Sequence, residues 1–283
     1  MPEGLEAELY RRSAERALHR TIGSVDVDGR QPMAPELRTA LPGAEFTSAD
    51  RVGKLVVLGI DGSAAGSLGL HFGMTGRLVV DGEAAITELE YASGRDDAAW
   101  DRLTIRFVDG GVLRVNDPRR WAKFVLDPTL AHLGPDFLSV TADHLSAAFG
   151  RRRAPVKTVL LDQAVVAGYG NMCVDEVLWQ IGLSPLTPAR EVPSAAIRRL
   201  TEFAPGHLLG MLERGGSHRG TIDPAVRAAV PGCPRDGTPM RRDQVGGRTT
   251  IWCPSQQHQG APIVADWAQR DDHPPVPPAR DDR

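Results

Sequence analysis

The hydrophobic pattern changes twice along the chain, and its central part is typical of β-strands. Between about residue 21 and residue 126, short runs of aliphatic and β-branched residues alternate with turns of the Asp-Gly type. The clearest runs lie at residues 54–58, 68–72, 77–80 and 103–108, and the turns at Asp61-Gly62, Asp81-Gly82 and Asp109-Gly110. Short strands separated by such turns favour a sandwich or a barrel. We therefore expect a β-sandwich or barrel-like unit in this region.

The segments on either side have helical spacing. Leu5, Leu9 and Leu18, with small alanines between charged residues, predict a helix over residues 3–19 that follows an extended start. Beyond residue 129 the pattern predicts four further helices, at residues 141–149, 156–161, 174–181 and 195–214, and a glycine-rich turn over 168–171 joins the middle pair. The second half of the chain is therefore predicted to be helical.

These changes predict an α+β protein with four parts. We expect a β-rich domain over residues 1–127, a helical domain over 128–228 and a small hairpin unit over 229–260. The last part, residues 261–283, is rich in Pro and Asp and is expected to be disordered. A length of 283 residues is enough for about two domains of ordinary size.

Composition and charge narrow the class of protein. No run approaches the ~20 apolar residues of a membrane span, and the amino terminus is acidic and lacks the apolar core of a secretory signal. Three cysteines, an odd number, argue against a disulfide framework. We therefore expect a soluble cytoplasmic protein.

The formal net charge of −3 lacks the basic bias that is usual in proteins that bind nucleic acid. The charges are segregated along the chain, however. Acidic residues gather in 81–101, while basic residues gather in 114–157, including Arg114, Arg119, Arg120, Lys123, Arg151, Arg152, Arg153 and Lys157. Because binding depends on a basic face and not on the sum of charges, this distribution is compatible with a positive groove.

Pro2 is the most unusual candidate for chemistry. Removal of Met1 would leave a free prolyl amine at Pro2. An α-amino group has a pKa of about 7.7–8.0, against about 10.4 for a lysine, so a larger fraction is unprotonated at neutral pH. A secondary amine that attacks a sugar aldehyde carbon gives an iminium directly. Taken alone the signal is weak, and the favoured interpretation of Pro2 is then a simple lead-in to the first helix.

Six blocks in the same order resemble the formamidopyrimidine-DNA glycosylase / endonuclease VIII family. The first is Met1-Pro2-Glu3-Gly4-Leu5-Glu6, and the others lie at residues 53–58, 71–78, 116–121, 133–136 and 156–178. The last block resembles the helix-two-turn-helix DNA-binding segment, and the similarity runs to about residue 257. The resemblance implies a β-sandwich with flanking helices, a helical domain and a terminal finger hairpin, with damaged double-stranded DNA in the cleft between them. It also implies a monomeric, nucleoid-associated protein.

The resemblance also implies roles for residues at the beginning of the chain. Pro2 would be the nucleophile at C1′, Glu3 the general acid and base, and Lys54 a ligand of the phosphate beside the lesion. Glu6 would be a second carboxylate that supports the lesion site. The alternative for Glu6 is an exposed acid in the first turn of a helix, and the alternative for Lys54 is a lysine at a strand edge.

Two further groups of residues would hold the DNA. Lys157, Asn171 and Arg248 would complete the phosphate clamp, with Asn171 at a helix amino terminus that offers N–H groups to an anion, or simply capping that helix. Enzymes that act on a base flip it out of the stack, and something must fill the gap. By resemblance this group is Met74, Arg119 and Trp121, for which the alternative is that Met74 and Trp121 lie in the core.

The finger lacks two of the cysteines that the family commonly uses for zinc. The positions read Cys233-x2-Asp236, then sixteen residues, then Cys253-x2-Gln256. Structural zinc sites use four Cys or His ligands. Two cysteines and Asp236, with Gln256 or His258 as a fourth ligand, form a poor alternative set. We therefore predict no zinc and no other cofactor, and a hairpin that is stabilised by packing, with Ile251 and Trp252 as candidates.

The function implied is that of a bifunctional DNA glycosylase and AP lyase of base excision repair. Pro2 would displace an oxidised base, form a Schiff base with the opened sugar and cleave the strand by elimination. Two alternatives stay open: a non-catalytic relative that binds damaged DNA, and a glycosylase that prefers oxidised pyrimidines or abasic sites. The short segment 215–221, where the family's lesion loop follows a helix, leaves the preferred lesion open.

Overall fold

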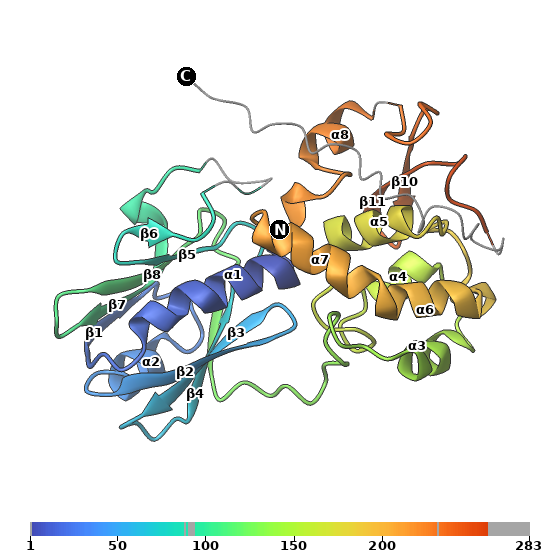
Figure 1. The fold of residues 1–283 in the computed structure, drawn as a ribbon. Helices are drawn as coiled ribbons and strands as arrows, with labels where there is room; N and C mark the ends of the chain where they lie inside the picture. The colour runs from blue at the N-terminus through green and yellow to red at the C-terminus, as the bar shows by residue number, and fades with distance from the viewer. Residues whose placement is uncertain (1, 88, 90–93, 231, 260–283) are drawn as a thin grey trace.

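The computed structural model describes residues 2–87, 89, 94–230 and 232–259. Its amino-terminal half contains two antiparallel sheets (Figure 1). The five-stranded sheet has the order β1 (Ile22–Val27), β7 (Asp101–Phe107), β8 (Val112–Asn116), β5 (Arg77–Val80) and β6 (Glu83–Ala84). The four-stranded sheet has the order β2 (Glu45–Val52), β3 (Leu55–Asp61), β4 (Ser67–His71) and β9 (Lys123–Leu126). The predicted β-sandwich is therefore confirmed.

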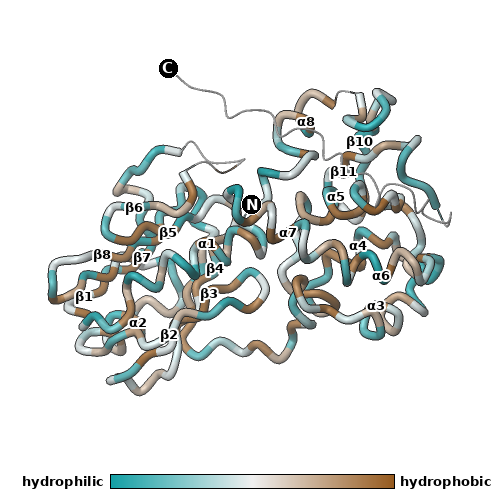
Figure 2. The backbone as a smooth tube through the Cα atoms, in the orientation of Figure 1, coloured by the Kyte–Doolittle hydropathy of each residue, from teal (hydrophilic) through white to brown (hydrophobic). Residues whose placement is uncertain are grey.

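Both sheets contribute to one hydrophobic core. Val56 and Leu58 of β3 are buried against the same cluster as Leu103 and Ile105 of β7. Figure 2 shows hydrophobic positions along these strands and hydrophilic ones at many of the connecting loops. A short helix that the sequence did not predict, α2 (Ala34–Ala40), packs beside β1.

The helical half has a second core. It is built by α3 (Ala142–Phe149), α4 (Val156–Leu160), α5 (Asn171–Gln180), α6 (Ser194–Glu202) and α7 (Ala204–Glu213). The prediction of one helix over 195–214 is wrong, because the chain forms α6 and α7 with a break at Phe203. The cause is Pro205, whose ring lacks an N–H donor and is accommodated only in the first turn of a helix.

Helix α1 (Gly4–Ala14) links the two halves. Its Leu5 belongs to the helical core, while Tyr10 and Ala14 belong to the sandwich core. The helix is shorter than predicted, because it passes into a 3-10 turn at Glu15–Ala17. Figure 1 shows the start of α1 between the two halves, so the first residues of the chain lie where the two cores meet.

The finger is a small unit with its own core. It consists of α8 (Pro224–Ala229), which the sequence did not predict, and the hairpin of β10 (Arg241–Val245) and β11 (Arg248–Trp252). Gly246 and Gly247, with φ of 57° and 73°, form a two-residue turn that only glycine adopts readily at both positions. As predicted, Ile251 is packed in this core, and Trp252 is 6% exposed.

The predicted tail, residues 261–283, lies outside the described residues. Within the described residues, no helix has the length and apolar character that crossing a membrane requires.

Candidate active site

Glu3 is buried and is held by the main chain of α5. Its Oε1 accepts a hydrogen bond from the N–H of Met172 at 2.8 Å, and its Oε2 accepts one from the N–H of Cys173 at 3.0 Å. The amino terminus of a helix favours an anion, because its first N–H groups have no partner within the helix. The sequence predicted that this end of α5 offers N–H groups to an anion. In the described structure, these two N–H groups bind Glu3.

Gly170 is required for this contact. A Cβ atom built on Gly170 would lie 2.2 Å from the carboxyl carbon of Glu3. Gly170 is the residue before α5, so a side chain there would push Glu3 off the helix end. The glycine-rich turn recognised in the sequence therefore leaves space for the carboxylate.

Glu6 is also buried, which excludes the alternative of an exposed first-turn acid. Its Oε2 accepts from the N–H of Glu3 at 2.8 Å, and its Oε1 accepts from the N–H of Ser217 at 2.6 Å. Burial, and then the charge of Glu3, raises the pKa of the Glu6 carboxyl. Glu6 thus connects the backbone of Glu3 with the segment at 215–221. Its role toward a lesion stays a prediction.

Lys54 lies in the two-residue turn between β2 and β3. Gly53, with φ of 59°, allows this turn to approach Gly168, whose N atom would lie 3.2 Å from a Cβ at Gly53. Burial lowers the pKa of Lys54, and the nearby Glu3 opposes that shift. Pro2 is buried beside Glu3 at the start of the chain. The structure therefore gathers Pro2, Glu3 and Lys54, three residues of the predicted site from two segments of the chain, at the junction of the two cores.

Met74, Arg119 and Trp121 lie together, as the sequence predicted. Nη1 of Arg119 is 3.7 Å from Sδ of Met74, and its guanidinium carbon is 5.1 Å from the centre of the Trp121 ring. Trp121 is 51% exposed, which excludes the alternative that its ring is part of the core. An exposed aromatic ring beside an arginine is suited to contact a base, but that contact stays a prediction.

Asp117 organises this group, and the sequence did not identify it as functional. Its buried carboxylate accepts from the N–H of Trp121 at 2.6 Å and of Ala122 at 2.7 Å, and it also accepts from the Thr75 hydroxyl. The signal was present in the sequence, because an Asp before Pro commonly bonds the backbone N–H groups that follow it.

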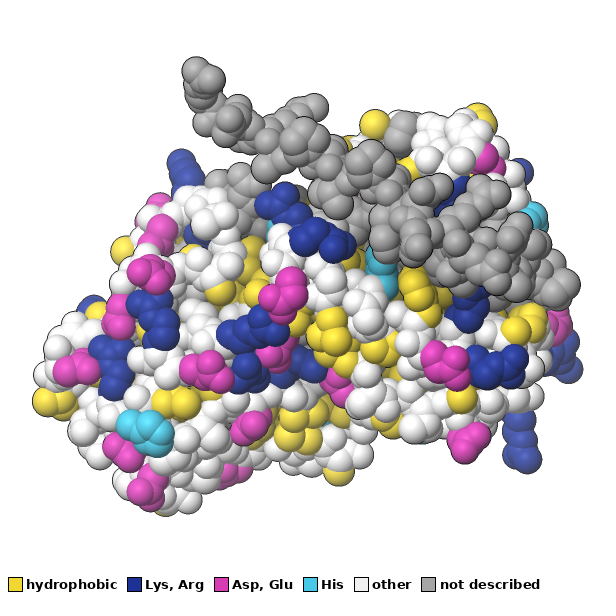
Figure 3. Space-filling view, viewed as in Figure 1, with side chains coloured by type: hydrophobic (Ala, Val, Ile, Leu, Met, Phe, Trp, Pro, Cys, Tyr) yellow, Lys and Arg dark blue, Asp and Glu magenta, His cyan; other side chains and the backbone are white. Residues whose placement is uncertain are grey.

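A pocket of about 530 Å³ opens beside these residues. Met74 and Trp121 line it from the sandwich half and Arg248 from the finger, and further basic groups line it at Arg30, Arg120 and Lys123. On the face shown in Figure 3, by contrast, Lys and Arg side chains are interspersed with Asp and Glu over the amino-terminal half. The pocket is therefore the place where described basic side chains converge from both halves.

The predicted separation of charges is only partly realised in space. Arg114, which the sequence grouped with a basic groove, forms ion pairs with Asp96 at 2.6 Å and with Asp101 at 3.1 Å. The acidic segment therefore neutralises this arginine, because β7 and β8 are neighbouring strands and bring the two segments together.

Lys157 does not lie where the expected phosphate clamp would place it. Its side chain is fully buried, and Nζ donates to Asp175 Oδ1 at 2.6 Å, to the Thr249 carbonyl at 3.1 Å and to the Thr250 hydroxyl at 2.7 Å. An ammonium has three donors, so all of them are used within the protein. Burial lowers the pKa of Lys157, and Asp175 opposes the shift.

The other two clamp residues lie at the hairpin of β10 and β11. The Asn171 amide donates to the Thr249 carbonyl at 2.9 Å, and its Oδ1 has no hydrogen-bond partner among the described residues. Asn171 is the first residue of α5, after Gly170, so its side chain does not cap the helix. Arg248 lines the pocket.

The finger gathers three groups of the kind that ligate zinc. The ligand atoms of Cys233, Asp236 and Cys253 lie within 4.8 Å of one another. Asp236 already accepts from the Ser255 hydroxyl at 2.8 Å and from the Gln256 amide at 2.7 Å. Gln256 thus turns its N–H₂ group to the cluster, and an amide nitrogen is not a zinc ligand. The described residues supply three of the four ligands that a structural zinc site needs, so the fit is incomplete.

Comparisons with known proteins agree over most of the chain. A family model described as the formamidopyrimidine-DNA glycosylase N-terminal domain matches residues 1–124, and one described as the formamidopyrimidine-DNA glycosylase H2TH domain matches residues 133–221. The formamidopyrimidine-DNA glycosylase of Xanthomonas euvesicatoria pv. vesicatoria is 36% identical over 252 residues, covering 81% of this chain and 88% of the relative. That of Xanthomonas campestris pv. campestris strain B100 is 35% identical over 255 residues, with the same coverage of both chains.

Solved structures show the same fold. Lactococcus lactis Fpg in complex with DNA that contains an oxidised pyrimidine has a TM-score of 0.74 at 23% identity, covering 91% of this chain and 100% of that chain. The complex of Lactococcus lactis Fpg with DNA that contains an abasic site has a TM-score of 0.74 at 22% identity, with the same coverage. At this level of identity the likeness concerns the fold.

Proposed function

Since the chain belongs to the formamidopyrimidine-DNA glycosylase family, we propose that it is a DNA glycosylase of base excision repair that also cleaves the strand as an AP lyase. Its partner is damaged double-stranded DNA, bound across the pocket between the sandwich and the finger. The observation that carries this proposal is the buried Glu3 carboxylate, which is fixed by two backbone N–H groups directly after the buried Pro2.

Pro2, freed by removal of Met1, supplies the nucleophile. Its nitrogen lone pair forms the bond to C1′, and the bond from C1′ to the damaged base breaks, so the base leaves with that electron pair and takes up a proton. Glu3 takes up the proton that the Pro2 nitrogen loses and transfers it to the ring oxygen, and the sugar opens to an iminium that joins Pro2 to C1′. Loss of a C2′ proton then expels the 3′ phosphate, which cleaves the strand.

Glu3 is prepared for this task by its rigid position. A general acid must be held within hydrogen-bond distance of the atom that it protonates, and two main-chain donors fix the carboxylate with no flexible side chain between them. Lys54, across from Glu3, supplies positive charge for the phosphate beside the lesion. Its pKa is lowered by burial, so a neighbouring phosphate would favour its charged form.

Met74, Arg119 and Trp121 fill the space that the flipped nucleotide leaves. Trp121 and Met74 insert into the base stack, and Arg119 bonds the unpaired partner base. Asn171 and Arg248 bind phosphates on the finger side. Their support is the position of Arg248 in the pocket wall and the hydrogen bond from the Asn171 amide to the carbonyl of Thr249, the residue after Arg248.

The finger is proposed to be held without zinc. Its support is the incomplete ligand set, together with a hydrophobic core of its own at Trp179, Ile222, Met240 and Ile251.

Borohydride trapping tests the proposal. Duplexes that carry an 8-oxoguanine, an oxidised pyrimidine or an abasic site are incubated with the protein and sodium borohydride, which reduces the iminium to a stable amine. We expect a covalent adduct with at least one duplex, and a much lower yield for Pro2→Gly on duplexes that still carry the damaged base, because its terminal primary amine does not give an iminium directly. Protein that binds these duplexes but never forms an adduct would instead be a non-catalytic relative. The relative yields from the three duplexes give the lesion preference.

A further inference from the structure

A carbonyl in the finger receives hydrogen bonds from three separate helices. The Thr249 carbonyl accepts from Lys157 of α4 at 3.1 Å, from Asn171 of α5 at 2.9 Å and from Arg227 of α8 at 3.3 Å. Thr249 directly follows Arg248 in β11. The backbone beside Arg248 is thus fixed to three helices at one atom.

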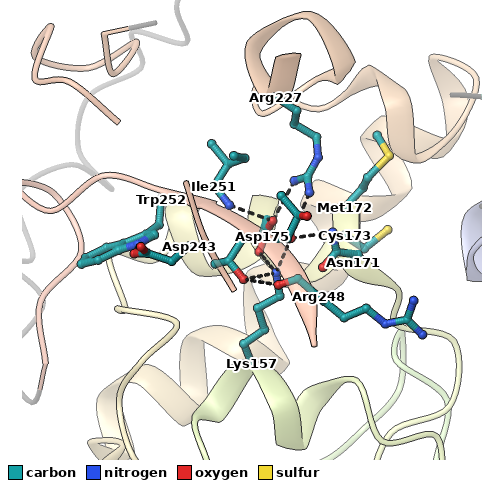
Figure 4. A network of polar contacts seen from close by, with 12 residues as sticks. Lys157, Asn171, Met172, Cys173, Asp175, Arg227, Asp243, Arg248, Ile251 and Trp252 are labelled. Atoms are coloured by element: carbon teal, nitrogen blue, oxygen red, sulfur yellow. Dashed lines mark hydrogen bonds and ion pairs between the residues drawn. The ribbon is translucent and has the colours of Figure 1, made fainter. Parts of the chain in front are cut away.

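The side chain of Asp175, in α5, links the same helices through ion pairs. Its Oδ1 accepts from Lys157 at 2.6 Å, and its Oδ2 accepts from Arg227 at 2.7 Å and from the N–H of Ile251 at 3.2 Å. The side chains of Asp175 and Lys157 are fully buried, and that of Arg227 is 6% exposed. Figure 4 shows the three charged groups converging between α4, α5 and the hairpin.

The turn of the hairpin, before Arg248, packs against α4. A Cβ at Gly246 would lie 2.6 Å from the Thr158 hydroxyl of α4, so the turn before Arg248 rests on the same helix that carries Lys157. The backbone is therefore fixed on both sides of Arg248. In Figure 4 the Arg248 side chain itself points away from the buried charges.

We propose that Asp175, Lys157 and Arg227 form a positioning cluster that holds the finger hairpin at a fixed place and thereby directs Arg248, together with Asn171, at the DNA backbone. This rests on the proposed function only for the identity of the partner as DNA. Lys157 then contributes to DNA binding through the hairpin and does not itself contact a phosphate, since its three donors are used within the protein.

The effect of a substitution in this cluster depends on how many buried charges it leaves without a partner. The cluster contains one carboxylate and two cations, so Asp175 is the only described anion in contact with either cation. Removing it leaves two unpaired buried charges, whereas removing Lys157 leaves the pair of Asp175 and Arg227 intact. Breaking a buried pair from one side is costly, because the remaining charge has neither water nor a partner.

A double-mutant cycle tests the cluster. The affinity for a duplex with a tetrahydrofuran abasic analogue is measured over a range of salt for wild type, Lys157→Met, Arg248→Ala and the double variant. We expect Lys157→Met to weaken binding about tenfold in the wild-type background but less than about twofold after Arg248→Ala, because coupled residues are not additive. The slope of log K against log [salt] should fall by about 0.9 in either single variant, as for one lost phosphate contact, and no further in the double.

If Lys157→Met lowers the affinity equally with and without Arg248→Ala, Lys157 binds a phosphate directly. If it does not lower the affinity at all, Lys157 does not position Arg248. Either result overturns the proposal. Glu176→Gln is the matched control. It neutralises a buried carboxylate of α5 that pairs with His207 at 2.9 Å and accepts from the N–H of Ile222 at 2.7 Å, but that belongs neither to the charge cluster nor to the contacts of β10 and β11 among the described residues. Its effect on affinity should be independent of Arg248.

Hydrogen exchange of the DNA-free protein separates this proposal from the proposed function. Asp175→Asn should speed exchange at the amides of residues 241–252 by about tenfold or more, and Lys157→Met, which keeps the pair of Asp175 and Arg227, by a smaller factor, while amides of the sandwich keep their wild-type rates. Unchanged exchange at 241–252 would overturn the cluster even if the protein forms adducts with DNA. Conversely, absence of adducts with wild type would refute the glycosylase and leave this result standing.

Discussion

At the amino terminus of α1 a buried carboxylate is held by main-chain N–H groups, whereas at the finger a main-chain carbonyl is held by side chains. Glu3 accepts from Met172 and Cys173, and Thr249 accepts from Lys157, Asn171 and Arg227. Both arrangements use the start of α5, because its backbone N–H groups bind Glu3 and its Asn171 side chain is one of the three donors to Thr249. Helix α5 is thus the common support of the two sides of the cleft.

The two arrangements should respond differently to mutation. A carboxylate on backbone donors depends mainly on empty space around it, because a main-chain N–H group is lost only when proline replaces the residue. A carbonyl on charged side chains depends on the balance of charge, because every donor can be removed separately. The first region should therefore be sensitive to added volume at Gly170, and the second to the loss of a single charge in the cluster.

Glu3→Gln should have the largest effect on the reaction. A glutamine keeps the size of the side chain but cannot act as a general acid and base, so base excision should fall by about 10²–10⁴-fold. The measurement is the single-turnover rate of base release from the duplex that gives the best trapping yield. Glu8→Gln is the control, because Glu8 lies on the same helix and pairs with Arg11 and Arg12. Unchanged excision in Glu3→Gln would remove Glu3 from its assigned role.

Gly170→Ala should affect catalysis through position alone. The new methyl group would lie 2.2 Å from the Glu3 carboxyl carbon, so Glu3 must move while keeping its charge. A displacement of about 1 Å can reduce a rate by about 10²-fold, and we expect a loss of that order in single-turnover excision. Gly206→Ala in α7 is the control, since a Cβ there meets nothing within 4 Å. If both variants excise at the wild-type rate, the close packing around Glu3 is not needed for the reaction.

The comparison also explains what could be predicted from the sequence. Strand pattern and Asp-Gly turns predicted the sandwich, because alternation and turn chemistry are local properties. The grouping of Met74, Arg119 and Trp121 followed from the family resemblance, since these residues come from two separate segments. The break before α7 was missed even though its cause, Pro205, was visible.

The finger could be predicted less well, because its support comes from distant parts of the chain. Lys157 was expected, by resemblance, to bind a phosphate, whereas it is buried and paired. Its partners Asp175, Thr249 and Thr250 lie far along the sequence, and no spacing rule relates them. Glu3 was identified by resemblance, but its position on the end of α5 became visible only when the two halves were brought together.

The smallest effect is expected from chelation, which tests whether the finger relies on its side-chain cluster and its core or on a metal. Treatment of the wild-type protein with EDTA should change its Tm by less than about 1 °C, because a ligand stabilises a fold only when it binds the folded state. The double variant Asp236→Cys with Gln256→Cys completes a four-cysteine set at the spacing of a zinc finger. It should bind one zinc per chain, measured by mass spectrometry of the metal, and its Tm should fall on chelation. Wild-type protein that retains stoichiometric zinc and loses stability with EDTA would show instead that three ligands suffice, and that both a metal and the buried charges fix the hairpin.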